Sequence, residues 1–157
     1  MEMSIPLWLF QGVPESLAVT SLAVVLSGQA LKLRPVMMVG LPQAVSAFLV
    51  RLLPISFGIH TVILLVLLSI WLTLILKIRL SRSLPAALVT VILLGAAEVG
   101  VFSIVLPLWG ITFEQIMQND LLLIVICLPQ TILIFALALG IEWWKTKRHK
   151  KSGEYHA

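Results

Sequence analysis

Residues 59–78 read IHTVILLVLLSIWLTLILKI, and this stretch decides the fold. The only charged side chain in it is Lys77, which lies next to its end. A lipid bilayer requires about 20 consecutive apolar residues for one helical crossing. A hydrocarbon interior also requires the backbone to satisfy its own hydrogen bonds, as a helix does. Residues 59–78 therefore predict a membrane-spanning helix.

Further apolar segments occupy most of the remaining chain, at about 13–31, 36–53, 84–108 and 121–144. Of the 157 residues, 60% are hydrophobic and only 11% are charged. The mean hydropathy is +1.09. A soluble domain of this length cannot bury so much apolar surface, whereas a bilayer covers it. We therefore expect an all-α, polytopic transmembrane bundle: one five-helix domain at 1–144, followed by a basic tail at 145–157.

The basic residues predict the orientation of these helices. All Lys and Arg residues except Arg51 follow the first, third or fifth segment, and so lie on one side of a five-helix bundle. The positive-inside rule makes that side cytoplasmic, with the N-terminus outside and the C-terminus inside. Trp8 and Trp109 then fall near the outer interface, and Trp143 and Trp144 near the inner one, as in an aromatic belt.

Three shorter segments lie outside the expected spans. Residues 5–10 are apolar but too short to cross, so we expect them to lie at the outer interface. Residues 111–117 have helical spacing of apolar side chains, with Thr112 as an N-cap, and predict a short amphipathic helix. We expect the tail to be mostly disordered beyond its first turn. Its basic side chains anchor the topology or attract anionic lipids: Lys145, Lys147, Arg148, Lys150 and Lys151.

Charged side chains within apolar segments are costly, and they are the strongest functional signal in this chain. Glu98 lies well inside residues 84–108. In the expected topology Glu98 shares the outer half of the membrane with Glu15, Arg51 and His60, while Gln43 and Gln130 lie deeper. These residues form either a polar pocket that binds a ligand or responds to pH, or an ion pair of Arg51 with a glutamate that fixes helix packing.

Small residues recur at helical spacing in two segments. Ala96 and Gly100 are four residues apart, as are Ala136 and Gly140. Such pairs let membrane helices approach closely. We expect them to pack inside the bundle, with a homo-oligomer interface as the alternative.

No catalytic motif accompanies these features. The sequence contains no Walker A loop, HExxH, CxxC pair or nucleophile elbow, so we expect no enzyme, no cofactor and no metal site. A lipid-acting enzyme would need more interfacial ligands than His60 and Glu114. Cys127, the single cysteine, is expected to be a small packing residue. The net charge of +4 is placed as membrane topology requires, and we expect no nucleic-acid partner.

The stretch RLLPISFGIHT at residues 51–61, together with Pro14-Glu15 and Leu128-Pro129-Gln130, resembles the N-terminal membrane module of Firmicutes GHKL-type sensor histidine kinases. The resemblance implies a multi-helix input region in a bacterial plasma membrane. No phosphoacceptor-helix pattern and no ATP-binding domain follow the fifth segment, so we expect a free-standing module without the kinase domain.

Two functions are compatible with these patterns. The first is a non-enzymatic sensing or regulatory module that acts through a cytoplasmic or membrane signalling partner. The second is a small transporter, or the membrane subunit of a transport complex, in which Glu98, Arg51 and the proline-interrupted segments line a path. Five helices are few for a monomeric transporter, so the second function requires an oligomer or a partner ATPase.

Overall fold

The computed structural model describes residues 8–53, 57–112, 115–116 and 119–154, and this part of the chain is all-α. Its long elements are η1 (Trp8–Gly12), α2 (Val13–Leu26), α3 (Leu33–Arg51), α4 (Phe57–Leu76), α5 (Leu80–Trp109) and α7 (Asp120–Glu154). Five stretches are long and apolar enough to cross a membrane, namely Trp8–Leu26, Leu33–Arg51, Ile59–Leu76, Leu80–Trp109 and Leu121–Arg148. The predicted helical class and the predicted number of spanning-length helices are confirmed.

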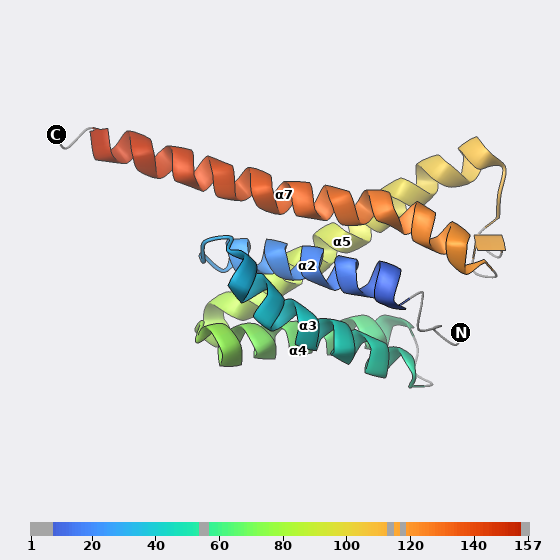
Figure 1. The fold of residues 1–157 in the computed structure, drawn as a ribbon, viewed down its shortest axis with the longest axis horizontal. Coiled ribbons are helices and arrows are strands. Elements are labelled where there is room, and N and C mark those ends of the chain that lie inside the picture. The colour runs from blue at the N-terminus through green and yellow to red at the C-terminus, as the bar shows by residue number, and fades with distance from the viewer. Residues whose placement is uncertain (1–7, 54–56, 113–114, 117–118, 155–157) are drawn as a thin grey trace.

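Successive long helices run in alternating directions, so their connections gather at two ends of the bundle (Figure 1). We term one of these the amino-terminal end of the bundle. It holds the starts of α2 and α7 and the ends of α3 and α5 (Figure 1). The opposite, carboxy-terminal end holds the connections from α2 to α3 and from α4 to α5. Beyond this end the last part of α7 extends past the other helices (Figure 1).

Helix α2 is the centre of the bundle, because it packs against α3, α5 and α7. In the most apolar 18-residue stretch of Trp8–Leu26, 56% of residues are buried. In the corresponding stretch of Leu80–Trp109, only 6% are buried. Leu22, Ala23 and Val24 are fully buried. The outward faces of α4 and α5 instead carry large exposed apolar side chains, such as Val62 and Ile92. This surface suits lipid, which does not penalise apolar exposure.

The helices α2 and α3 approach each other closely at Gly40. A Cβ atom built on Gly40 would lie 2.6 Å from Leu17 Cδ2 and 3.5 Å from both Leu17 Cα and Thr20 Oγ1. Carbon atoms pack at about 3.5–4.0 Å, so even a methyl group at this position requires the end of the Leu17 side chain to move. Glycine at this position therefore sets how closely the two helices pack.

The first spanning helix is shifted from the expected range 13–31. The π-helix η1 leads directly into α2, and Trp8 Nε1 donates a hydrogen bond of 3.0 Å to the Ala44 carbonyl of α3. At the other end α2 stops at Leu26, because Gly28 adopts a φ of +93° that turns the chain. Residues 8–10 are thus continuous with α2 in the spanning-length stretch Trp8–Leu26, while residues 5–7 lie outside the described part.

The helices α3, α4 and α5 are joined by side-chain hydrogen bonds. Gln43 Nε2 donates to the Leu64 carbonyl at 3.2 Å, and Trp71 Nε1 donates to Ser46 Oγ at 3.3 Å. The hydroxyls of Thr73 and Ser83 lie 2.8 Å apart. Hydrogen bonds between helices remain useful in lipid, since no water competes for the same groups. Pro42 is accommodated within α3, which begins at Leu33 and so earlier than the expected residue 36.

The connection between α4 and α5 is shorter than expected, because α5 begins at Leu80 instead of residue 84. The amides of Arg82 and Ser83 both donate to the Arg79 carbonyl, at 2.8 and 3.1 Å, and close the first turn. Lys77 makes the reversal with a positive φ of 53°. Between α5 and α7, Thr112 N donates to Gln115 Oε1 at 2.9 Å, and Gln115 N donates to Thr112 Oγ1 at 3.4 Å. This is a capping box, so Thr112 is an N-cap as predicted; residues 113–114 and 117–118 lie outside the described part.

The tail was expected to be mostly disordered, but α7 continues without a break to Glu154. The Lys147 ammonium lies 4.8 Å from the centre of the Trp143 ring, and the Arg148 guanidinium 3.8 Å from that of Trp144. Both are cation–π contacts between residues four apart, which stabilise a helix. Lysine and arginine are also good helix formers, so the charge of this segment does not oppose helix formation.

Candidate functional site: a polar core around α2

Three charged side chains from three different helices lie within electrostatic reach of one another. They are Glu15 near the start of α2, Arg51 at the end of α3, and Glu98 in α5. The charge of Arg51 acts on the carboxyls of both Glu15 and Glu98, and the charge of Glu98 also acts on the carboxyl of Glu15. Each of the three side chains is half-buried. The alternating helix directions bring these residues to the same end of the bundle, although they are far apart in sequence.

Helix α7 contributes two further residues at the same place. The Cys127 thiol is buried, with 4% of the residue exposed, and the charges of Glu15, Glu98 and Arg51 all act on it. Gln130 lies one turn further along the same face of α7 and is 3% exposed. Its amide oxygen has no hydrogen-bond partner among the described residues.

The register of α2 against α7 and α5 places Gln130 at about the same level of the bundle as Glu15 and Glu98. Ile134 and Ala138 of α7 form one buried cluster with Ala18 and Leu22 of α2, and Leu94 and Ala97 of α5 pack against it. Gln130 precedes Ile134 by one turn of α7, just as Glu15 precedes Ala18 by nearly one turn of the parallel α2. Glu98 follows Ala97 directly. We term this group the polar core: Glu15, Arg51, Glu98, Cys127 and Gln130.

His60, the fourth member of the expected cluster, is tied to the backbone. Its Nε2 atom lies 2.6 Å from the Val50 carbonyl at the end of α3. This carbonyl also accepts a hydrogen bond from the Leu53 amide at 3.2 Å. The imidazole therefore contacts the residue that precedes Arg51 and joins α4 to α3; no contact of His60 with Glu15 or Glu98 is found in the described chain.

More amide and hydroxyl groups are buried around α2. Gln43 is 5% exposed and Gln11 is 9% exposed, while Thr20 is fully buried. The side-chain oxygens of all three lack a hydrogen-bond partner in the part of the chain that the structure describes. The sequence analysis did not single out Gln11 or Thr20. Gln11 could have been recognised from its spacing, because it lies four residues before Glu15 and therefore on the same helical face.

The basic residues of the expected tail have different environments. Lys145 Nζ donates a hydrogen bond to the Val25 carbonyl in the last turn of α2. The same carbonyl accepts a hydrogen bond from the Gly28 amide at 3.1 Å, and a cation at this position interacts favourably with the helix dipole. Lys147 and Arg148 are exposed beyond it, whereas the side chains of Lys150 and Lys151 lie outside the described part.

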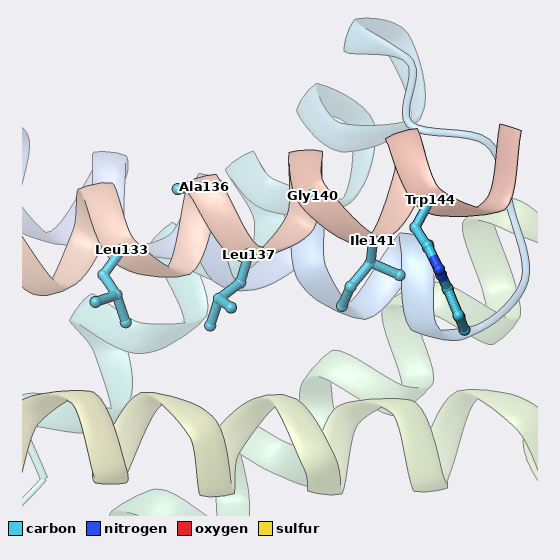
Figure 2. A pocket seen from close by; sticks show the side chains of 6 residues that line it. All are labelled: Leu133, Ala136, Leu137, Gly140, Ile141 and Trp144. Carbon is cyan, nitrogen blue, oxygen red and sulfur yellow. The ribbon is translucent and has the colours of Figure 1, made fainter. Parts of the chain in front are cut away.

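The small-residue pairs do not pack inside the bundle. Ala96, Gly100, Ala136 and Gly140 are all exposed, and a Cβ atom on either glycine would meet nothing within 4 Å. The expectation of packing within the bundle is therefore wrong for both pairs. Ala136 and Gly140 instead line an apolar groove on α7 together with Leu133, Leu137, Ile141 and Trp144 (Figure 2). The groove contains no charged side chain, in contrast to the polar core.

Five helices long and apolar enough to cross a bilayer, with charged residues gathered around the central one, define the class of multi-pass membrane proteins. No protein-family model, curated protein or solved structure matches the chain significantly. A function is therefore inferred from the geometry of the polar core and of α7.

Proposed function

We propose that this chain is a non-enzymatic sensing or regulatory module of a bacterial plasma membrane, acting through a cytoplasmic partner. The observation that carries the proposal is the course of α7. This helix contributes Cys127 and Gln130 to the polar core and then continues, unbroken, to the exposed basic turn at Lys147 and Arg148. A continuous helix is one kind of element through which a change at one site reaches another.

Two further features support a signalling role. Pro129 lies inside α7 between Cys127 and Gln130, where it removes a backbone donor and favours a kink. Residues 51–61, which carry the resemblance to the input modules of GHKL-type kinases, include Arg51 of the polar core and His60 beside it. In this proposal a change in the polar core alters α7, and the basic turn presents that change to the partner.

The orientation in the membrane gives a prediction that a labelling experiment tests. The positive-inside rule places Ser81, beside Arg79 and Arg82, in the cytoplasm and Gln115 outside. In a Cys127→Ala background, a membrane-impermeant maleimide is expected to label Gln115→Cys in intact cells. It is expected to label Ser81→Cys only after the cells are permeabilised. Both positions are exposed, so accessibility within the bundle does not limit either reaction. Labelling of Ser81→Cys in intact cells would contradict the orientation.

The partner is tested by site-specific photo-crosslinking in native membranes. A benzophenone side chain at Thr146, which is exposed on the projecting turn of α7, is expected to capture one signalling protein reproducibly. The same group at Leu139, exposed in the apolar part of α7, is the matched control and should capture no such partner. Mass spectrometry identifies the captured protein, and Glu98→Gln should change the crosslinking yield severalfold.

Each outcome of this experiment decides the proposal. A histidine kinase or regulator captured only from Thr146, with a yield that depends on Glu98, supports it. A yield that is independent of Glu98 contradicts the coupling of the polar core to the partner, and no capture contradicts a cytoplasmic partner. Capture of a transport ATPase or a solute-binding protein overturns the sensing role.

A transport function is the second candidate, and the buried polar groups in two proline-containing helices favour it. Pro42 precedes Gln43 in α3, and Pro129 precedes Gln130 in α7. Proline-interrupted helices frequently line the substrate path of transporters. If the chain transports, Glu98→Gln abolishes solute flux into proteoliposomes, whereas a sensor shows no flux in either form.

A further inference from the structure

The polar core contains a buried hydrogen-bond acceptor without a donor. The amide oxygen of Gln130 is unpartnered among the described residues, and Gln130 is more than nine-tenths buried. An acceptor buried without a donor destabilises the fold, so this oxygen calls for a donor or a cation.

The charges of the polar core are also unbalanced. Two carboxylates, on Glu15 and Glu98, face one guanidinium, on Arg51. Among the side chains that the structure describes, the other titratable groups near these three are the Cys127 thiol and the His60 imidazole, which faces the Val50 carbonyl. With both carboxyls ionised, one negative charge is left without a counter-charge inside an apolar bundle. Such a charge is expensive unless a partner neutralises it.

From these two observations we infer that the polar core binds one monovalent metal cation, sodium or potassium, between α2, α5 and α7. The carboxylates of Glu15 and Glu98 supply the charge, and the amide oxygen of Gln130 supplies a neutral ligand. Carboxylate and carbonyl oxygens are the ligands of hard metal cations in proteins. The inference goes beyond the proposed function, because binding of an ion requires no protein partner.

The chemistry of the ligands separates this cation from two alternatives. A proton on one carboxyl supplies a single donor, whereas a metal ion accepts several oxygen ligands at once. A divalent ion ordinarily takes more carboxylate charge, and the described chain has no group of three or more His, Cys, Asp or Glu residues able to hold a metal ion. The guanidinium of Arg51 cancels one of the two carboxylates, which leaves the charge that a monovalent ion neutralises.

The test is the thermal unfolding of the purified full chain in detergent at fixed pH and ionic strength. Sodium chloride, potassium chloride and N-methylglucamine chloride are compared over a concentration series. A ligand of the folded state stabilises it by mass action, so one metal ion is expected to raise the Tm saturably, by about 3–6 °C at ten times its Kd. The sodium and potassium arms identify which ion is preferred.

Variants connect this shift to the polar core. Gln130→Leu keeps the volume of the side chain but removes the amide oxygen, and it should weaken the response to the ion at least severalfold. Glu98→Gln removes the excess negative charge and should abolish the response. Glu142→Gln, which changes a half-buried carboxylate near the other end of α7, is the matched control and should respond like the native chain.

Every result decides the inference. Equal Tm values in all three salts overturn it, and so does a Tm that depends on pH alone, since this assigns the missing charge to a proton. An ion response unchanged in both Gln130→Leu and Glu98→Gln also overturns it. Partner capture from Thr146 is measured independently, so failure of the cation site and failure of the sensing role are distinguishable.

Discussion

Replacement of Gly40 by leucine is expected to prevent α2 and α3 from docking and to abolish the folded state. The first side-chain atom already lies 2.6 Å from Leu17 Cδ2, and the larger side chain would also meet the α2 backbone and Thr20. Overpacking a filled core costs about 1–3 kcal/mol for modest insertions and more for larger ones. Because α2 is the central helix, we expect Gly40→Leu to yield no monodisperse protein in size-exclusion chromatography after detergent extraction.

Two further variants separate a clash at this contact from a general effect of leucine. Gly40→Ala requires only that the flexible end of Leu17 move, so it is expected to fold with a Tm lower by several degrees. Gly100→Leu introduces the same side chain in α5, where a Cβ atom meets nothing within 4 Å, and should leave the Tm nearly unchanged. A normal Tm for Gly40→Leu would show that α2 and α3 do not pack as described.

Loss of Arg51 is expected to be the most damaging change of a charged side chain. Arg51→Gln leaves the carboxylates of Glu15 and Glu98 facing each other without their guanidinium. Removing one partner of a buried charge group costs about 3–5 kcal/mol, and the half-buried position of Arg51 places the expected loss near the lower limit. Thermal unfolding followed by tryptophan fluorescence measures this loss.

A second substitution tests whether the loss has an electrostatic cause. Adding Glu98→Gln to Arg51→Gln removes one of the two repelling carboxylates and is expected to restore part of the Tm. Arg34→Gln, at an exposed position near the start of the same helix, is the control and should change stability by about 1 kcal/mol or less. If the double variant were no more stable than Arg51→Gln, then packing of the arginine stem would account for its role.

Apolar run length predicts the number of helices but not where each one ends. The five apolar runs are enough to predict this number, because a helix that can span a bilayer is recognised from its composition and length alone. The ends depend on single residues: the positive φ of Gly28 stops α2 early, and Lys77 turns the chain so that α5 starts early. The end of α7 was mispredicted because a high charge density indicates a solvated segment, while its cation–π contacts at four-residue spacing favour a helix.

The polar core could be predicted only in part. Glu98 stands out because a carboxylate is rare inside an apolar run, and alternating helix directions predict that it shares an end of the bundle with Glu15 and Arg51. Whether a glutamine faces the bundle or the lipid depends on helix rotation, which so apolar a sequence does not specify. For this reason the burial of Gln130 against α2, and the position of Cys127 within reach of three charges, emerge only from the fold.

The bond from Lys145 to the Val25 carbonyl has a consequence for how the protein is made. It joins the first of the five spanning-length helices to the fifth. Until α7 enters the membrane, one side of α2 has no cover, and Glu15 lacks its neighbours from α7. The core therefore closes only after α7 has been synthesised. We expect a chain truncated before α7 to leave polar groups of α2 facing lipid and to be less stable in the membrane.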